Sequence, residues 1–321
     1  MRGLFGRLVS RLVGPSAEML VKYPSSAATA DAEELARVLS SLPGYRVLRA
    51  IDSEAGVERL RPVQPGDRIA AVVDTETTGL DLANDRIIEV AVQRFAFDRR
   101  QRITEVERPR SWLEDPRRPL PDTITRLTGI SDRDLAGQTF DEEAIVGLIG
   151  GADIVIAHNA AFDRPFLDRR FPQLGDSPWA CSLSQLDWQD LGYDGRALGH
   201  LLLQSGRFFE GHRAGNDTNA LTTLLSTTVS DGRTLLAHLL ERCERESVRI
   251  DATGAPFEAK DALKLRGYRW DATRRLWWRE VELEGSDEET AWLEQQVYRG
   301  KGSPRLVTLT PRTRFTHDRV A

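Results

Sequence analysis

Between about residues 68 and 230, short apolar runs alternate with amphipathic helical patterns, and this alternation constrains the fold more than any other feature. The runs IAAVV and RIIEVAVQRFAFD predict two adjacent strands, and ADIVIAHN predicts a buried strand. Helical spacing follows in DEEAIVGLIG, AAFDRPFLDRRF, LGHLLLQSG and NDTNALTTLLSTTV. The alternation predicts an α/β sheet with helices on both faces, and the short link between the first two strands indicates a mixed sheet.

The composition is that of a globular protein. The chain has 321 residues, more than the roughly 100 to 200 residues of one domain, and no apolar run is long enough to span a bilayer. Its two cysteines, Cys181 and Cys243, lie in no disulfide or zinc pattern, so we expect a reducing, cytoplasmic location. The net charge of −5 argues against a surface that attracts nucleic acid everywhere, but it leaves local binding open.

Composition shifts divide the chain into four parts. Residues 1–67 form a partly helical N-terminal extension, in which MRGLFGRLVSRLVG predicts a short amphipathic surface helix and AEELARVLSSL a second helix. Residues 68–230 form the α/β domain. Residues 231–298 hold a connecting helix and a small α+β module, and residues 299–321 form a basic tail that we expect to be poorly structured.

Two acidic residues, Asp74 and Glu76, end the first strand of the predicted sheet. Residues i and i+2 of a strand point to the same face, so both carboxylates are expected to reach one place. Oxygen ligands of this kind suit a hard divalent cation such as Mg²⁺ or Mn²⁺. Taken alone, the pair is also compatible with a solvated strand end.

Two further motifs, HNAAFD and HRAGND, place polar residues at the starts of predicted helices. Asp163 falls in the first turn of its helix, where an acid also complements the helix dipole. His212 precedes Asp217 by five positions, and a surface histidine with a capping aspartate is the corresponding structural interpretation. Each motif alone therefore leaves a purely structural role open.

Together, DTETTG, HNAAFD and HRAGND resemble the motifs of the DnaQ-like exonucleases of the DEDDh type, a family that includes the exonuclease subunit epsilon of DNA polymerase III. The resemblance covers roughly residues 68–230. It implies a ribonuclease-H-like fold, with a mixed sheet flanked by helices on both faces. It also implies a phosphodiester hydrolase that shortens nucleic acid from the 3′ end.

The resemblance implies a role for each matching residue. Asp74, Glu76 and Asp217 correspond to the principal metal ligands, Asp163 to the fourth acid and His212 to the general base. Two divalent cations, Mg²⁺ or Mn²⁺, are the implied cofactors. The nucleotide pocket of the family corresponds to four residues, which are Thr77, Gly79, Leu80 and Phe162.

A free, single-stranded or frayed 3′ end is the expected substrate, with DNA favoured over RNA and 5′-mononucleotides as products. Two alternatives stay open: an exoribonuclease on short RNA, and a non-catalytic scaffold that binds single strands. A proofreading subunit is a third, although no segment marks a polymerase or repair partner. We expect no membrane association.

The small C-terminal module mixes basic and aromatic residues. Residues 256–281 contain seven basic and four acidic residues, interleaved with Tyr268, Trp270, Trp277 and Trp278. Basic side chains among aromatic ones are typical of surfaces that bind single strands. Alternatively, the aromatic residues form the core of a very small domain. The sequence leaves both interpretations open.

Overall fold

The computed structural model describes residues 26–51, 58–59, 64–272 and 274–316. The chain divides into two compact units, Met1–Val47 and Leu48–Ala321. In the first unit, helix α2 (Ser26–Ser40) confirms the helix expected from AEELARVLSSL. The amphipathic helix expected at MRGLFGRLVSRLVG lies outside the described residues. Within these ranges, no helix has the length and apolarity needed to span a bilayer.

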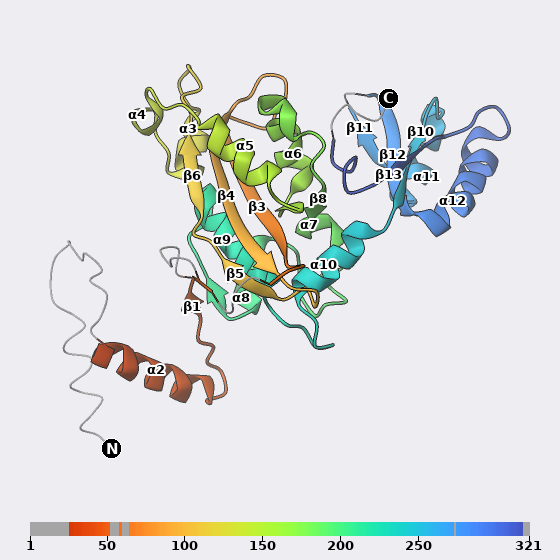
Figure 1. Cartoon of the computed structure of the whole chain (residues 1–321). Helices are drawn as coiled ribbons and strands as arrows, with labels where there is room; N and C mark the ends of the chain where they lie inside the picture. The colour runs from red at the N-terminus through yellow and green to blue at the C-terminus, as the bar shows by residue number, and fades with distance from the viewer. Residues whose placement is uncertain (1–25, 52–57, 60–63, 273, 317–321) are drawn as a thin grey trace. The chain divides into compact units, whose positions relative to one another are not determined.

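The second unit is built on a seven-stranded mixed sheet, as the sequence predicts (Figure 1). Strand β3 lies at its centre, antiparallel to β4 and parallel to β7, which in turn pairs in parallel with β8. In spatial order the strands are β2 (Glu58–Arg59), β5 (Ile103–Val106), β4 (Ile87–Phe97), β3 (Arg68–Thr77), β7 (Ile154–Ala157) and β8 (Trp179–Cys181), and β6 (Arg110–Leu113) also pairs with β4.

Both faces of this sheet are buried, because alternate residues of the central strands pack into two separate apolar cores. Ala70 and Val72 of β3 join one core, and Ala71 and Val73 join the other. The first core contains residues of α8 (Leu198–Gln204), α9 (Ala214–Leu225) and α10 (Leu235–Glu244), and the second contains residues of α5 (Glu142–Gly150) and α6 (Ala160–Arg170). Helices therefore cover both faces, as expected.

Shorter elements complete the large unit. Strands β1 and β9, of two residues each, pair in parallel. A small apolar cluster around Leu120 and Ile130 lies beside β4. The bounds are β1 (Arg49–Ala50), β9 (Arg207–Phe208), α3 (Asp122–Thr128), α4 (Asp132–Leu135), α7 (Ser182–Gln185) and the 3-10 turn η1 (Pro172–Leu174).

The C-terminal module is a four-stranded antiparallel sheet with its own apolar core. Its strands, in spatial order, are β11 (Arg269–Asp271), β12 (Leu276–Glu282), β10 (Ser247–Ala252) and β13 (Arg305–Leu309). Its helical segments are η2 (Phe257–Ala259), α11 (Lys260–Leu265), η3 (Leu283–Gly285), α12 (Ser286–Trp292) and the π-helix η4 (Leu293–Tyr298). The expectation of a poorly structured tail is wrong for residues 305–309, because they pair with β10.

A buried arginine ties the segment after β13 to helix α6. Arg164 is 0% exposed, and its guanidinium donates to the carbonyl oxygens of Arg312 at 2.6 Å and Arg314 at 2.7 Å. It also donates to the carbonyl oxygen of Gly175 at 3.0 Å and lies 3.3 Å from the carboxylate of Asp168. A buried cation is tolerated only when its donors are satisfied, so this segment is part of the support of α6.

Replacing this arginine should destabilise the protein strongly. Arg164→Leu would remove the hydrogen-bond donor of the carbonyl groups of Arg312 and Arg314 and the ion pair with Asp168, at a cost of about 3 to 5 kcal/mol. Urea unfolding would measure this loss. Arg126→Leu, on the exposed surface of α3, should stay within about 0.5 kcal/mol of wild type. Equal losses for both variants would contradict the assignment.

Candidate active site

The end of strand β3 presents two acidic side chains toward the start of helix α9. Asp74 and Glu76 are both half-buried, and Asp217 comes from the first turn of α9. One carboxylate oxygen from each lies within 4.8 Å of the other two. Three oxygen donors at this spacing fit a hard divalent cation. Oδ2 of Asp217 is buried without a hydrogen-bond partner, which leaves it available as a ligand.

The fourth acid, Asp163, lies beside this group and is held by the strand itself. Its Oδ1 accepts hydrogen bonds from the backbone N–H of Thr75 at 3.0 Å and from the Thr75 hydroxyl at 2.8 Å. Because Thr75 lies between Asp74 and Glu76, these bonds fix the first turn of α6 against the acidic end of β3. The structure thus brings three of the four predicted acids within 4.8 Å and holds the fourth alongside them.

Burial and mutual repulsion disfavour the ionised form of these carboxylates in the metal-free protein, so their pKa values are raised. Burial raises the pKa of Glu76 to about 8, and the charges of Asp217, Glu89 and Asp163 add to that shift. Burial likewise raises the pKa of Asp163 to about 7 and of Asp217 to about 6, with hydrogen bonds opposing both shifts. The pKa of Asp74 is also raised, by burial and then by its acidic neighbours. A bound divalent cation would relieve this repulsion.

His212 lies at the start of the same helix, next to Asp217. Its side chain is exposed, and hydrogen bonds from the backbone of His212 and Arg213 lower the pKa of Asp217. The φ angle of His212 is +66°, in the left-handed region that few non-glycine residues adopt. This backbone turn leads directly into α9, so the histidine and the aspartate are held by one local structure.

A fifth carboxylate, Glu89, which belongs to none of the three sequence motifs, supports this turn. Glu89 is 1% exposed and pairs with Glu76 across β3 and β4. Its side chain accepts hydrogen bonds from Arg213 at 3.2 and 3.3 Å and from the backbone N–H of Ala214 at 3.2 Å. It therefore caps the N-terminus of α9. A lone charge within the apolar run IIEVAV was the available signal.

His158, which ends strand β7, has a structural role. Its Nδ1 lies 2.8 Å from the Ser182 hydroxyl, and its Nε2 lies 2.8 Å from the carbonyl oxygen of Arg196. A carbonyl oxygen only accepts, so Nε2 carries the proton and Nδ1 accepts from Ser182. Burial lowers the pKa of His158 to about 4, so the ring is neutral near pH 7. It ties β7 to the loop that follows α7.

The comparisons with known proteins agree with this geometry. Residues 71–225 match the RNase_T family, which is described as exonuclease. The chain carries a domain of the exonuclease family. The acidic residues at the end of β3 and the start of α9 all lie inside the matched residues. The domain is thus a nuclease domain with a candidate metal site, as the resemblance implied.

Individual relatives cover this domain to different extents. The chain is 39% identical over 107 residues to a DNA polymerase III PolC-type protein of Halalkalibacterium halodurans, covering 32% of the chain but 7% of that relative. It is 27% identical over 186 residues to the DNA polymerase III subunit epsilon of Treponema pallidum, covering 55% of the chain and 83% of the relative. Escherichia coli Exonuclease I bound to an oligonucleotide aligns at 14% identity over 77% of the chain and 64% of that structure, with a TM-score of 0.44.

The four residues proposed for the nucleotide pocket of the exonuclease domain differ in their surroundings. Leu80 is 85% exposed, whereas Phe162 is partly buried and packs against Phe166 with ring centroids 5.0 Å apart. Thr77 is buried, and its hydroxyl donates to the carbonyl oxygen of Gly79 at 2.5 Å. A Cβ on Gly79 would clash with the Asp85 carboxylate, so a side chain at this position would have to displace Asp85. Contact with a nucleotide stays a prediction for all four.

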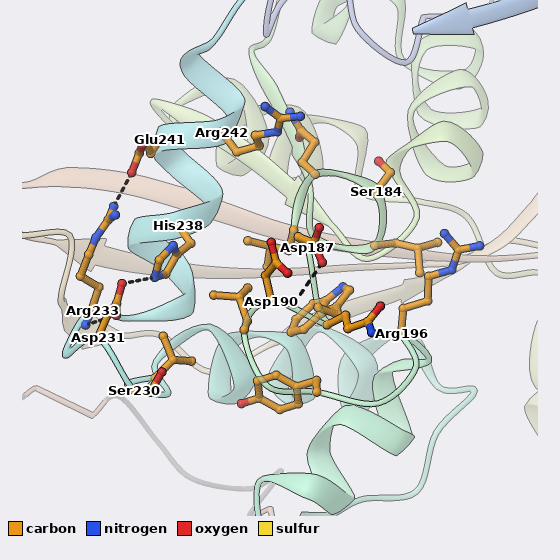
Figure 2. A pocket seen from close by; sticks show the side chains of 18 of the residues that line it. Ser184, Asp187, Asp190, Arg196, Ser230, Asp231, Arg233, His238, Glu241 and Arg242 are labelled. Carbon is orange, nitrogen blue, oxygen red and sulfur yellow. Dashed lines mark hydrogen bonds and ion pairs between the residues drawn. The ribbon is translucent and has the colours of Figure 1, made fainter. Parts of the chain in front are cut away.

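The exonuclease domain also has a large hollow, of about 1230 Å³, that contains none of the metal-site acids. Figure 2 shows its wall, formed by α10 with His238 and Glu241, the loop with Asp187 and Arg196, and the turn with Asp231. Four arginines and five carboxylates line it; Arg233 forms an ion pair with Glu241, and Nε2 of His238 lies 3.0 Å from the Asp231 carboxylate. Without net positive charge, this hollow does not attract a polyanion.

The raised pKa values predict that the metal site destabilises the metal-free protein at alkaline pH. Between its ordinary pKa of 4.5 and its folded pKa of about 8, Glu76 binds more proton in the folded state than in the unfolded chain. The free energy of unfolding therefore falls as pH rises through this window. In EDTA at pH 8, Glu76→Gln should resist urea better than wild type, and below pH 4 the difference should vanish.

A matched control is Glu246→Gln, at an exposed glutamate, which should leave stability unchanged at both pH values. Adding Mn²⁺ at pH 8 should stabilise wild type and reverse the order, because Glu76→Gln removes a ligand. Equal stability of wild type and Glu76→Gln at pH 8 in EDTA would contradict the raised pKa of Glu76.

Proposed function

We propose that this protein is a metal-dependent 3′-to-5′ exonuclease that hydrolyses phosphodiester bonds at a free, single-stranded DNA 3′ end and releases 5′-mononucleotides. The observation that carries the proposal is the convergence of Asp74, Glu76 and Asp217 beside buried Asp163, with His212 at the start of the same helix as Asp217. The family match over residues 71–225 supports the nuclease chemistry. The direction and the DNA preference are supported by the resemblance to polymerase-associated exonucleases.

The carboxylates serve to hold divalent cations in place. Asp74, Glu76 and Asp217 provide direct ligands, and Asp163 fixes the end of β3 through Thr75. Two cations, Mg²⁺ or Mn²⁺, would activate the attacking water and stabilise the charge that develops on the leaving 3′ oxygen. The acids themselves stay fixed during the reaction, because β3 is buried on both faces and Glu89 caps α9.

His212 is the residue suited to accept the proton of the attacking water. It is exposed at the site, so its ring can reach a water molecule, and an imidazole exchanges protons near neutral pH. The backbone of the histidine bonds to Asp217, which keeps the base next to a metal ligand. The proton then passes to solvent, because the ring is not enclosed.

The direct test compares matched DNA and RNA oligonucleotides, labelled at the 5′ end, with Mg²⁺, with Mn²⁺ and with EDTA. We expect a metal-dependent ladder that shortens from the 3′ end, faster on DNA. Asp74→Asn should abolish it, and His212→Ala should lower kcat about 10² to 10⁴-fold. His200→Ala, at another exposed histidine, is the matched control and should keep wild-type activity.

Each other outcome has a defined meaning. Faster cleavage of RNA would replace the DNA assignment with an exoribonuclease. Binding of single strands without release of mononucleotides under either metal would favour the non-catalytic scaffold. Full activity of Asp74→Asn would exclude the proposed metal site. No polymerase or repair partner is needed for any of these assays.

The exposed side chain of Leu80 should contribute to binding of the terminal nucleotide rather than to the chemistry. Because Leu80 is 85% exposed, truncating its side chain removes little packing, so Leu80→Ala should leave the melting temperature unchanged. It should raise KM several-fold with kcat nearly unchanged. Leu127→Ala, on the exposed side of α3, is the control. Unchanged KM in Leu80→Ala would remove Leu80 from the proposed pocket.

A further inference from the structure

The C-terminal module lies outside the residues that match the exonuclease family, and one of its surfaces combines exposed aromatic rings with lysines. This surface, the lysine–aromatic patch, is formed by residues of η2, α11, β11 and β12. Its members are Phe257, Lys260, Lys264, Trp270 and Trp277.

Contacts between neighbouring side chains make the patch continuous. Nζ of Lys260 lies 4.5 Å from the ring centroid of Phe257, and Nζ of Lys264 lies 6.0 Å from that of Trp277. Trp277 and Trp270 are paired across β12 and β11, with ring centroids 5.5 Å apart. The two lysines are one helical turn apart on α11 and share a face. Each lysine of the patch therefore lies beside an aromatic ring, and Trp270 extends the ring of Trp277.

The most exposed rings of this patch are not needed to fill the module core. The core is built around Val248, Ile250, Leu263 and Tyr268, with Trp277 partly buried against it. Trp270, by contrast, is 51% exposed and Phe257 is 76% exposed. The structure thus separates the two interpretations that the sequence left open, because Tyr268 serves the core while Trp270 and Phe257 face solvent. Large exposed rings of this kind mark binding surfaces.

The charges of the patch are available to a ligand. Neither Lys260 nor Lys264 forms an ion pair with a carboxylate among the described residues. Two arginines of the module differ in this respect, since Arg266 and Arg279 are both paired with Glu289. A polyanion can therefore approach the lysines without displacing an internal partner.

We propose that the lysine–aromatic patch binds single-stranded nucleic acid, with bases stacking on Trp270 and Phe257 and phosphates contacting Lys260 and Lys264. Exposed rings beside lysines match a single strand, which presents unpaired bases beside phosphates. A duplex keeps its bases stacked on one another, so it can use the lysines and not the rings. The proposal rests on the proposed function only in taking the bound strand to be the substrate of the exonuclease site.

Binding is tested separately from cleavage, in the full chain carrying Asp74→Asn and in EDTA. Fluorescence anisotropy would report the Kd for labelled DNA and RNA strands of about 20 nucleotides, which exceed the roughly 4 to 16 nucleotides of common single-strand sites. Trp270→Ala and Phe257→Ala should each weaken binding about tenfold, and Trp270→Phe should retain most of the affinity. Lys260→Ala and Lys264→Ala should each reduce the slope of log Kd against log salt by about 0.7.

The controls match the chemistry of the changed residues. Leu306→Ala removes an exposed apolar side chain from β13, and Lys301→Ala removes a lysine after η4, so neither should change Kd. Thermal melts of all variants would show that the module stays folded. Wild-type affinity in both aromatic variants would overturn the proposal, as would equal affinity for a duplex or binding of anionic vesicles in place of oligonucleotides.

The same variants without Asp74→Asn distinguish this proposal from the proposed function. Hydrolysis by wild type with unchanged binding in the patch variants would reject the patch and keep the exonuclease. Patch-dependent binding without any hydrolysis would reject the exonuclease and keep the patch. If both hold, Trp270→Ala should raise KM for long strands with little change in kcat.

Discussion

Repulsion among the carboxylates at the end of strand β3 is the constraint on which the surrounding structure depends, because rigid elements must hold these acids together. Asp74, Glu76, Asp163 and Asp217 are brought together in partly buried surroundings that raise the pKa of each. Glu89 lies nearby and is paired with Arg213. Among the residues that the structure describes, none of these four acids forms an ion pair with a lysine or arginine, so the site favours an external divalent cation. The repulsion lowers the folding stability of the metal-free protein and favours binding of a divalent cation.

A repulsive site keeps its geometry only if the surrounding elements are rigid. Strand β3 meets this demand because both of its faces are buried and both of its edges are paired. Helix α9 is fixed by Glu89 at its first turn, and α6 is held at Asp163 by Thr75. The next residue of α6, Arg164, is held in turn by the segment after β13. Support for the acids thus extends well beyond the family-matched residues.

The three acidic motifs could be found from sequence, because each combines a distinctive order of residues with a clear strand or helix start. The supporting contacts could not. Arg213 and Glu89 are 124 positions apart, and no local periodicity indicates that pairing. Helix α10 was expected to lead out of the domain, yet it packs in the same core as α8 and α9. The apolar face of a helix shows in the sequence, but the elements that pack against that face do not. The domain end proposed at residue 230 is therefore better placed after α10.

The module shows the same limit at smaller scale. Its sequence pattern predicts a small α+β module, but strand β13 is short and carries exposed residues, so it resembled a tail. Successive tryptophans in β12 must face opposite sides of the sheet. Which of them joins the core depends on the position of α11, and the sequence alone does not give that position.

The hydrogen bonds of Arg164 link helix α6 to a segment that is synthesised much later. Its hydrogen-bond acceptors in residues 311–314 are translated after the exonuclease domain and the whole module. While a ribosome is still adding the module, this arginine lacks the carbonyl groups that offset its burial, and helix α6 next to Asp163 lacks its final support. We therefore expect a nascent chain to complete its candidate metal site late, after the segment that follows β13 has docked.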